Sequence, residues 1–355
     1  LRTCSGDRHI HIFYHPAMAE NLENHTTVAD DYPVSWWDLS PSDNFGIQKL
    51  EYLLGNIGYI KINVFAPVIF AGNTVISSMQ FLSAADGLIF DLRACRGGDP
   101  FTVQLFESYL FNDGKNPKLF HTKYLKVEYP VQQTWSLPFV PGKRLPDVPV
   151  YVLTSGDTFS GAEDMAYTLK HHQRARIVGE NTAGGAHPIE QFSIGSGFIV
   201  MLPNAYLEHP VTKSNWEGKG VSPDISAARE AALPIAHEDA LKQLLEQAKD
   251  SDQTHRLQWC LDRVKAVYHP VEVPKKTLVN YTGVYRGWEV KLLDDDLYLS
   301  EVNGIGTNKL MTITQNTFIA DQDYNLRFEI GEDGKARALT WLPKENKKEL
   351  EYQKD

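Results

Sequence analysis

The pattern of apolar and polar residues divides the chain into two regions. Up to about residue 270, short apolar runs typical of buried strands alternate with segments whose apolar residues recur at helical spacing. We predict strands at 10–14, 44–55, 58–64, 88–92, 148–153, 176–178, 198–202 and 206–207, and helices at 73–82, 101–110, 159–170 and within 236–267. Residues 18–44 are predicted to form a loop or extended linker. Residues 117–146 are predicted to form extended strands and loops that line one wall of a cleft. This alternation predicts an α/β core whose sheet is parallel in part.

The pattern changes after the proline-containing linker 270–276. Short strand candidates follow one another from residue 281 to residue 342, with turns at Asp294–Asp296, Asn303-Gly304 and Asp333-Gly334. Strands at this spacing predict a small antiparallel β domain. We therefore expect two domains, residues 1–269 and residues 277–355.

Composition narrows the functional classes. The chain has 355 residues and a net charge of −10. This acidic balance does not favour a nucleic-acid-binding protein, which would need a basic face. No apolar run is long enough to span a membrane. The cysteines (Cys4, Cys95 and Cys260) show neither metal-ligand spacing nor a disulfide framework. The chain starts at Leu1 without an initiator Met, so we expect a missing upstream segment, and a signal segment is not visible.

Ser160 lies where the predicted strand 148–153 gives way to the predicted helix. A hydroxyl there is close to free backbone N–H groups and to the positive end of the helix dipole, which favours a nucleophile. The alternative is structural, because Ser160-Gly161-Ala162-Glu163 matches a capping box.

A second loop, 93–100, follows the predicted strand 88–92 and carries Gly97 and Gly98. In partly parallel sheets, sites lie at the carboxyl ends of strands. A glycine pair exposes N–H groups suited to a developing oxyanion. The alternative is a tight turn; a phosphate loop is excluded because no Gly-Lys-Ser or Gly-Lys-Thr occurs.

Two further side chains stand out. His9 and His11 alternate with Ile10 and Ile12 on a short predicted strand. They could form a two-histidine metal pair, but no third ligand follows at a convincing spacing, so we predict no metal site. Glu217 lies in a turn-rich stretch, where a solvated carboxylate is the alternative to a functional acid.

Six short motifs occur in one order, and together they resemble a known family. They are Asp7-Arg-His9, Gly55-Asn-Ile-Gly-Tyr59, Asp91-Leu-Arg with Gly97-Gly98, Thr158-Phe-Ser-Gly-Ala-Glu163, Val178-Gly-Glu-Asn-Thr-Ala-Gly-Gly-Ala-His-Pro188 and Trp216-Glu-Gly-Lys-Gly-Val-Ser-Pro-Asp224. Residues 1–230 resemble the tail-specific (C-terminal-processing) serine peptidases, in the branch that includes interphotoreceptor retinoid-binding protein and is related to the tricorn protease. No segment resembling a PDZ domain lies between the motifs.

The resemblance implies roles for named residues. Ser160 corresponds to the nucleophile, His9 to the general base and Glu217 to the acid that orients the catalytic groups. The N–H of Gly161 and one from Gly97 or Gly98 correspond to the oxyanion hole. His187 is the competing base.

Two departures from the family pattern matter. A lysine base used elsewhere in the family is replaced by Gly185, which argues against a Ser–Lys dyad. In the glycine loop, Cys95 and Arg96 replace an Asn and a Gly; Arg96 either binds a substrate carboxylate or is solvated.

The resemblance implies a crotonase/ClpP-like β/β/α core and a serine endopeptidase that cleaves unfolded or short peptides through an acyl-enzyme on Ser160. It implies no cofactor, and it implies the extracytoplasmic location usual in the family. The oligomeric state stays open. One alternative is a catalytically silent binder of a lipid or retinoid-like apolar ligand, and another is an esterase-type serine hydrolase, although Ser160 lacks a Gly-x-Ser-x-Gly elbow.

Overall fold

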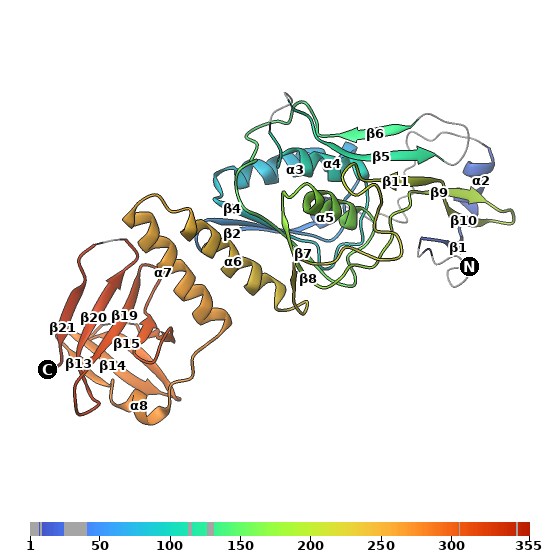
Figure 1. The fold of residues 1–355 in the computed structure, drawn as a ribbon. Helices are drawn as coiled ribbons and strands as arrows, with labels where there is room; N and C mark the ends of the chain where they lie inside the picture. Colours follow the sequence, from blue (N-terminus) through green and yellow to red (C-terminus); the bar gives the residue numbers. More distant parts are fainter. Residues whose placement is uncertain are drawn as a thin grey trace. The chain divides into compact units, whose positions relative to one another are not determined.

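The computed structural model describes residues 7, 9–24, 41–112, 116–125, 131–304, 306–345 and 347–355. The chain divides into two compact units, residues 1–236 and 237–355, whose elements are labelled in Figure 1. Helix α6 (Ala232–Glu246) begins in the first unit and ends in the second. The domain boundary expected at residues 269–277 stays a prediction.

The first unit is built on a six-stranded sheet. Its strand order is β12-β8-β7-β4-β3-β2. The strands are β2 (Ile47–Leu53), β3 (Ile57–Ile62), β4 (Gly87–Asp91), β7 (Val150–Thr154), β8 (Arg176–Gly179) and β12 (Ile225–Ser226). Neighbours from β3 to β12 pair in parallel, and β2 pairs antiparallel with β3. The predicted α/β core with a partly parallel sheet is confirmed.

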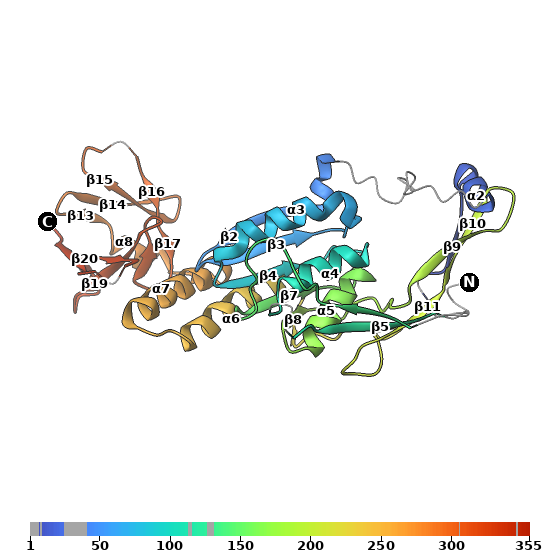
Figure 2. The same cartoon turned by 90° about the horizontal axis from the view of Figure 1, so that it is seen from above.

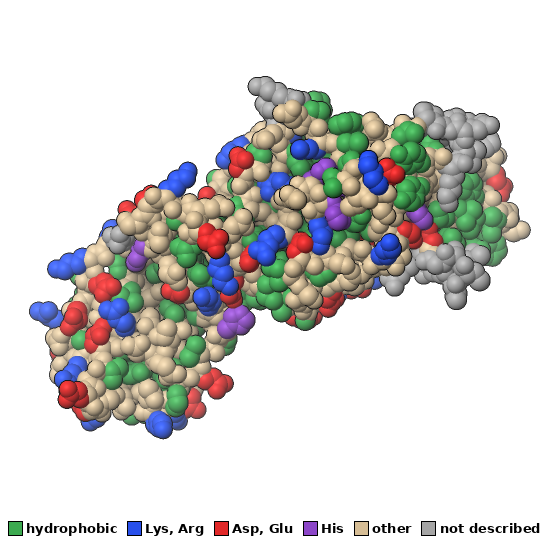
Figure 3. All heavy atoms as spheres, viewed as in Figure 1, with side chains coloured by type: hydrophobic (Ala, Val, Ile, Leu, Met, Phe, Trp, Pro, Cys, Tyr) green, Lys and Arg blue, Asp and Glu red, His purple; other side chains and the backbone are tan. Residues whose placement is uncertain are grey.

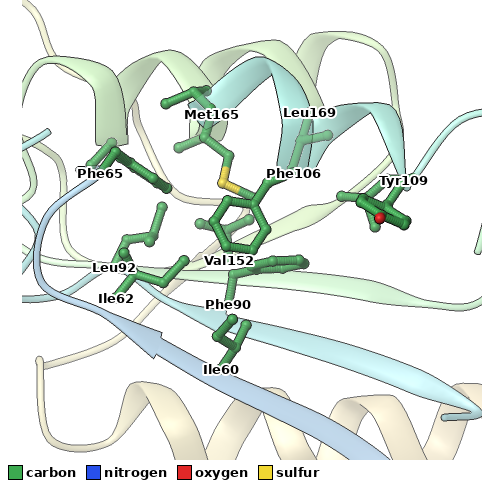
Figure 4. Packing of buried hydrophobic residues seen from close by; sticks show 14 of the residues in the cluster. Ile60, Ile62, Phe65, Phe90, Leu92, Phe106, Tyr109, Val152, Met165 and Leu169 are labelled. Atoms are coloured by element: carbon green, nitrogen blue, oxygen red, sulfur yellow. The ribbon is translucent and has the colours of Figure 1, made fainter. Parts of the chain in front are cut away.

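Three helices pack against this sheet: α3 (Val68–Phe81), α4 (Pro100–Ser108) and α5 (Gly161–His171). Figure 4 shows side chains from α4, α5 and the strands meeting in one apolar core, to which Ala71, Val75 and Met79 of α3 also belong. Phe90 on β4 packs edge-on against Phe106 on α4, and Met165 on α5 is fully buried. Burying a side chain of this size stabilises the fold by roughly 1.5–3 kcal/mol. Helix α3 begins five residues before the predicted start at Asn73, after Pro67 as N-cap.

Two smaller sheets complete this unit. The first has the order β11-β5-β6, with β5 (Leu119–Leu125), β6 (Gln132–Trp135) and β11 (Ala205–Glu208). The second, which we call the arm sheet, has the order β1-β10-β9, with β1 (His11–Tyr14), β9 (Ile189–Ser193) and β10 (Phe198–Pro203). It pairs the N-terminal strand antiparallel with a hairpin from the middle of the chain; the two strands of this hairpin, β9 and β10, lie side by side in Figure 2.

Part of the predicted loop 18–44 is helical, so that prediction was wrong there. Helix α2 spans Pro16–Glu23. The His15 side chain accepts a hydrogen bond from the Met18 N–H at 3.2 Å, and proline at the first helical position has its φ already set. Met18 then packs with Ile199 of the arm sheet. Residues 25–40 lie outside the described residues, and η1 (Pro41–Gly46) leads into β2.

The arm sheet leaves one face apolar and exposed. Ile12 and Phe192 both pair with Val200, and Tyr14 pairs with Phe198. The side chains of Ile12, Phe192, Tyr14 and Phe198 are between 41% and 64% exposed. Hydrophobic side chains are visible at this end of the unit in Figure 3.

The second unit begins within α6, continues with α7 (Ser251–Tyr268) and α8 (Lys275–Val279), and contains two antiparallel sheets. The four-stranded sheet comprises β13 (Gly283–Tyr285), β14 (Trp288–Leu293), β15 (Asp296–Glu301) and β16 (Asn308–Lys309). The five-stranded sheet comprises β17 (Met311–Thr312), β18 (Thr317–Ile319), β19 (Tyr324–Ile330), β20 (Ala336–Pro343) and β21 (Leu350–Gln353). Tyr281 stacks on Phe328 at 4.7 Å in their common core. The predicted antiparallel β region is confirmed.

Candidate active site

The loops that follow β4 and β7 meet at the carboxyl edge of the six-stranded sheet, as predicted. The Ser155 hydroxyl donates to the Arg93 carbonyl at 2.6 Å, and the Thr158 hydroxyl donates to the Leu92 carbonyl at 2.9 Å. The Phe159 N–H donates to the Cys95 carbonyl at 3.1 Å. These bonds hold the two loops in one fixed arrangement.

Ser160 occupies the N-cap of α5 with an unusual backbone. Its φ is 54° and its ψ is −122°, a conformation that costs a non-glycine residue about 1–3 kcal/mol. The Ser160 carbonyl accepts bonds from the N–H groups of Glu163 and Asp164, and the Ser160 N–H donates to Glu163 Oε2 at 2.9 Å. This last bond is the return half of the predicted capping box. A strained residue at a sheet edge is typical of functional sites.

Glu163 has a larger role than the capping box indicates. Its fully buried carboxylate accepts bonds from the Thr182 hydroxyl (2.5 Å) and from the N–H groups of Gly184 (2.6 Å) and Gly185 (2.8 Å), besides that of Ser160. Burial raises the pKa of this carboxyl, and the four donors oppose the shift. Glu163 thereby fixes the serine turn to loop 180–188.

The glycine loop lies against the start of α5. Gly97 has a φ of 94°, and a Cβ on it would lie 2.6 Å from the Gly161 nitrogen. A Cβ on Gly161 would lie 3.2 Å from the Gly98 nitrogen. Within the described residues, the N–H groups of these three glycines donate to no other backbone group. Three backbone donors without a backbone acceptor therefore lie near Ser160.

His9 is buried beside the serine turn. Its ring packs against Phe159 with centroids 4.5 Å apart, and it is 7% exposed. A Cβ on Gly185 would lie 2.7 Å from His9 Cε1 and 2.2 Å from Phe159 Cε2, so only glycine leaves room for both rings. Burial lowers the pKa of His9, and Asp7 and Glu217 partly oppose this shift.

Two carboxylates and a second imidazole lie next to His9. The Asp7 carboxylate accepts a hydrogen bond from the backbone N–H of His9 at 2.8 Å. Its Oδ1 also lies 3.3 Å from the ring atom His9 Nδ1. His187 Nδ1 lies 3.2 Å from Asp7 Oδ2 and 3.5 Å from Glu217 Oε2. Glu217 Oε2 accepts N–H bonds from Ala186 and His187. Asp7 occurs in the sequence motif, but its sequence spacing alone gave it no role.

The structure thus brings His9, His187 and Glu217 into one cluster, with Ser160 and the glycine N–H groups next to Phe159. Within the described residues, the His9 ring nitrogens make no hydrogen bond of standard geometry, either to Ser160 or to another group, although Nδ1 lies 3.3 Å from Asp7 Oδ1. Arg96 is exposed. Cys95 is buried, which raises its pKa to about 12; Cys4 lies outside the described residues.

Comparisons with known proteins agree with this architecture. Residues 56–227 match the model of peptidase family S41, which confirms the resemblance to tail-specific peptidases and supports a peptidase role. A candidate peptidase from Parabacteroides merdae ATCC 43184 has a similar fold, with 19% identity and a TM-score of 0.50 over 69% of this chain and 81% of that one.

Two other solved structures show weaker similarity. The photosystem II D1 C-terminal processing protease is 20% identical, with a TM-score of 0.41, over 56% of this chain; the match spans 47% of that protease. The tricorn protease is 19% identical, with a TM-score of 0.37, over 59% of this chain and 18% of its own. Among the described residues, no helix has the length and apolar character needed to cross a bilayer.

Proposed function

From the match of residues 56–227 to peptidase family S41, we propose that this protein is a serine endopeptidase acting on unfolded or short peptides. The observation that carries the proposal is the strained Ser160 turn, which lies beside three N–H groups with no backbone acceptor. An acyl-transfer site needs both features: a presented hydroxyl and donors for the developing oxyanion.

In the proposed reaction, Ser160 Oγ attacks the peptide carbonyl carbon while His9 takes the hydroxyl proton. The carbonyl oxygen becomes an oxyanion facing the N–H of Gly161 and that of Gly97 or Gly98. His9 then returns the proton to the leaving amine, and an acyl-enzyme remains. Water, deprotonated by His9, hydrolyses the ester and restores Ser160.

Support for His9 as base comes from three observations. It packs on the residue preceding Ser160, it lies beside Asp7 and Glu217, and its burial lowers its pKa, which favours the neutral form. Its ring also lies where a side chain at position 185 would extend, the position of the lysine base elsewhere in the family. His187, whose side chain is 23% exposed, is the competing base. It lies beside the same two carboxylates as His9, those of Asp7 and Glu217.

The test is labelling by a fluorophosphonate, followed by digestion of a peptide pool. We expect wild-type protein to be labelled and to cleave peptides, Ser160→Ala to do neither, and His9→Gln to lose far more activity than His187→Gln. Wild-type protein that is never labelled would favour the apolar-ligand binder. Labelled protein that hydrolyses simple esters but no peptide would favour the esterase.

We also propose an extracytoplasmic location. This rests on the family resemblance and on the Asn-x-Thr sequons at Asn24 and Asn280, which are compatible with glycosylation of a secreted chain. The oligomeric state stays open.

A further inference from the structure

Four side chains from three separate segments form one compact group: Asp7, His9, His187 and Glu217. We call it the acid–imidazole cluster. Asp7, His9 and Glu217 each offer a ligand atom, and these atoms all lie within 4.8 Å of one another. His11, which the sequence pairs with His9 as a candidate ligand, is not part of the cluster; its Nδ1 lies against the His9 carbonyl at 2.8 Å.

The spacing of the cluster suits a small tetrahedral ion. Zn²⁺ binds imidazole nitrogen and carboxylate oxygen at about 2.0–2.2 Å, which places neighbouring ligand atoms about 3.3–3.5 Å apart. His9 Nδ1 and Asp7 Oδ1 are 3.3 Å apart. His187 Nδ1 is 3.2 Å from Asp7 Oδ2 and 3.5 Å from Glu217 Oε2. Small side-chain rotations would therefore complete the shell.

An independent observation also points to a ligand. His9 is more than nine-tenths buried, yet within the described residues neither ring nitrogen makes a hydrogen bond of standard geometry: Nδ1 lies 3.3 Å from Asp7 Oδ1, and Nε2 has no hydrogen-bond partner. Buried polar atoms are normally bonded, and an unsatisfied one calls for an explanation. The cluster also contains two carboxylates, Asp7 and Glu217, whose negative charge a divalent cation would neutralise.

We propose that the acid–imidazole cluster binds a divalent transition-metal ion of the Zn²⁺ type, and that the bound ion inhibits the enzyme. The mixed nitrogen and oxygen donors favour such an ion over Mg²⁺ or Ca²⁺, which prefer oxygen ligands alone. The inhibitory part rests on the proposed function, because a metal on His9 occupies the lone pair that would take the Ser160 proton. The ion would also tie the N-terminal segment to loop 180–188 and to the loop carrying Glu217.

The binding test does not depend on activity. Ser160→Ala protein, which keeps every proposed ligand, is titrated with Zn²⁺ in competition with a chromophoric chelator. We expect saturable binding that Mg²⁺ does not displace and that His9→Gln or Glu217→Gln, added to this background, weakens by at least about tenfold. Asp7→Asn serves if His9→Gln fails to fold. His11→Gln, from the same segment, should bind as the parent does. His171→Ala should also do so, because His171 lies in a separate group with His172 and His209. Absent binding, or binding unchanged in the ligand variants, overturns the site.

The inhibition test uses wild-type protein. Fluorophosphonate labelling should slow as Zn²⁺ saturates the site and recover when EDTA is added. If the metal binds and labelling continues at its metal-free rate, the inhibitory role is overturned while the site stands. If labelling is absent even in EDTA, the peptidase proposal fails, and with it the inhibitory role; the titration then decides the metal site alone.

Discussion

The strained backbone at Ser160 predicts different behaviour for two inactive variants. Both Ser160→Ala and Ser160→Gly remove the hydroxyl, so neither should be labelled by a fluorophosphonate. Alanine keeps a Cβ at a φ of 54° and therefore keeps the strain. Glycine adopts this conformation without that cost. The bond from the residue 160 N–H to Glu163 is made by the backbone and survives in both variants.

The magnitude follows from two opposing terms. Releasing the strain should stabilise the glycine variant by about 1–3 kcal/mol, and the extra freedom of glycine in the unfolded chain costs about 0.5–1 kcal/mol. The net expectation is about 1 kcal/mol in favour of Ser160→Gly over Ser160→Ala. For a unit of 236 residues, that corresponds to a rise of about 2–4 °C in melting temperature.

The assay is a thermal melt of wild type and both variants at one pH, with EDTA present. Ser160→Ala should melt below wild type by no more than about 1–8 °C, since a lost cap costs about 0.5–2 kcal/mol. If Ser160→Gly melts below Ser160→Ala, the strain argument is refuted. If Ser160→Ala unfolds outright, the serine serves chiefly as a helix cap.

Three further predictions concern the surroundings of the serine. Burial lowers the pKa of His9 below its usual 6.5, so the acid limb of the pH profile of kcat/KM, measured in EDTA, should have its midpoint below pH 6.5. Asp7→Asn should move this midpoint lower still, because it removes a charge that favours the imidazolium. A midpoint above pH 6.5 would contradict His9 as the base. Gly185→Ala should displace both rings that border it and reduce kcat/KM by about tenfold or more, whereas Gly156→Ala, which meets nothing within 4 Å, should leave kcat/KM unchanged. Glu163→Gln places amide hydrogens among four hydrogen-bond donors. Denaturant titration should therefore show that the free energy of unfolding falls by about 1–3 kcal/mol. An unchanged denaturation midpoint would show that the carboxylate is dispensable.

Much of the core followed from local patterns, because the central parallel strands β4 and β7 are mostly apolar and fully buried. The helix after Ser160 followed from its apolar spacing. The position of its loop and of the glycine loop at the carboxyl ends of strands followed from the α/β pattern, whereas their grouping around one site was implied only by the family resemblance. Edge elements were harder to predict. Strand β9 was missed because Ile189–Ser193 alternates in burial only through its pairing with β10. Strand β21 was missed because Leu350–Gln353 lies in a highly charged tail and is held by β20.

The candidate site divides in the same way. Ser160, Gly97 and Gly98 could be proposed from local pattern alone. His9 and Glu217 needed the family resemblance, because 208 positions separate them in the printed sequence and no local pattern links them. The wider role of Glu163 depends on Thr182, Gly184 and Gly185, which contact it only through the tertiary fold.

The arm sheet gives the N-terminal strand an importance out of proportion to its length. Among the strands that the structure describes, β1 pairs with β10 alone and is not part of the six-stranded sheet. A single backbone cleavage near Tyr14 would therefore detach Asp7 and His9 while leaving the main apolar core intact. A sample could then be monodisperse and correctly folded by spectroscopy, yet inert because of one nick, so intact mass should be verified before any preparation is judged to lack turnover.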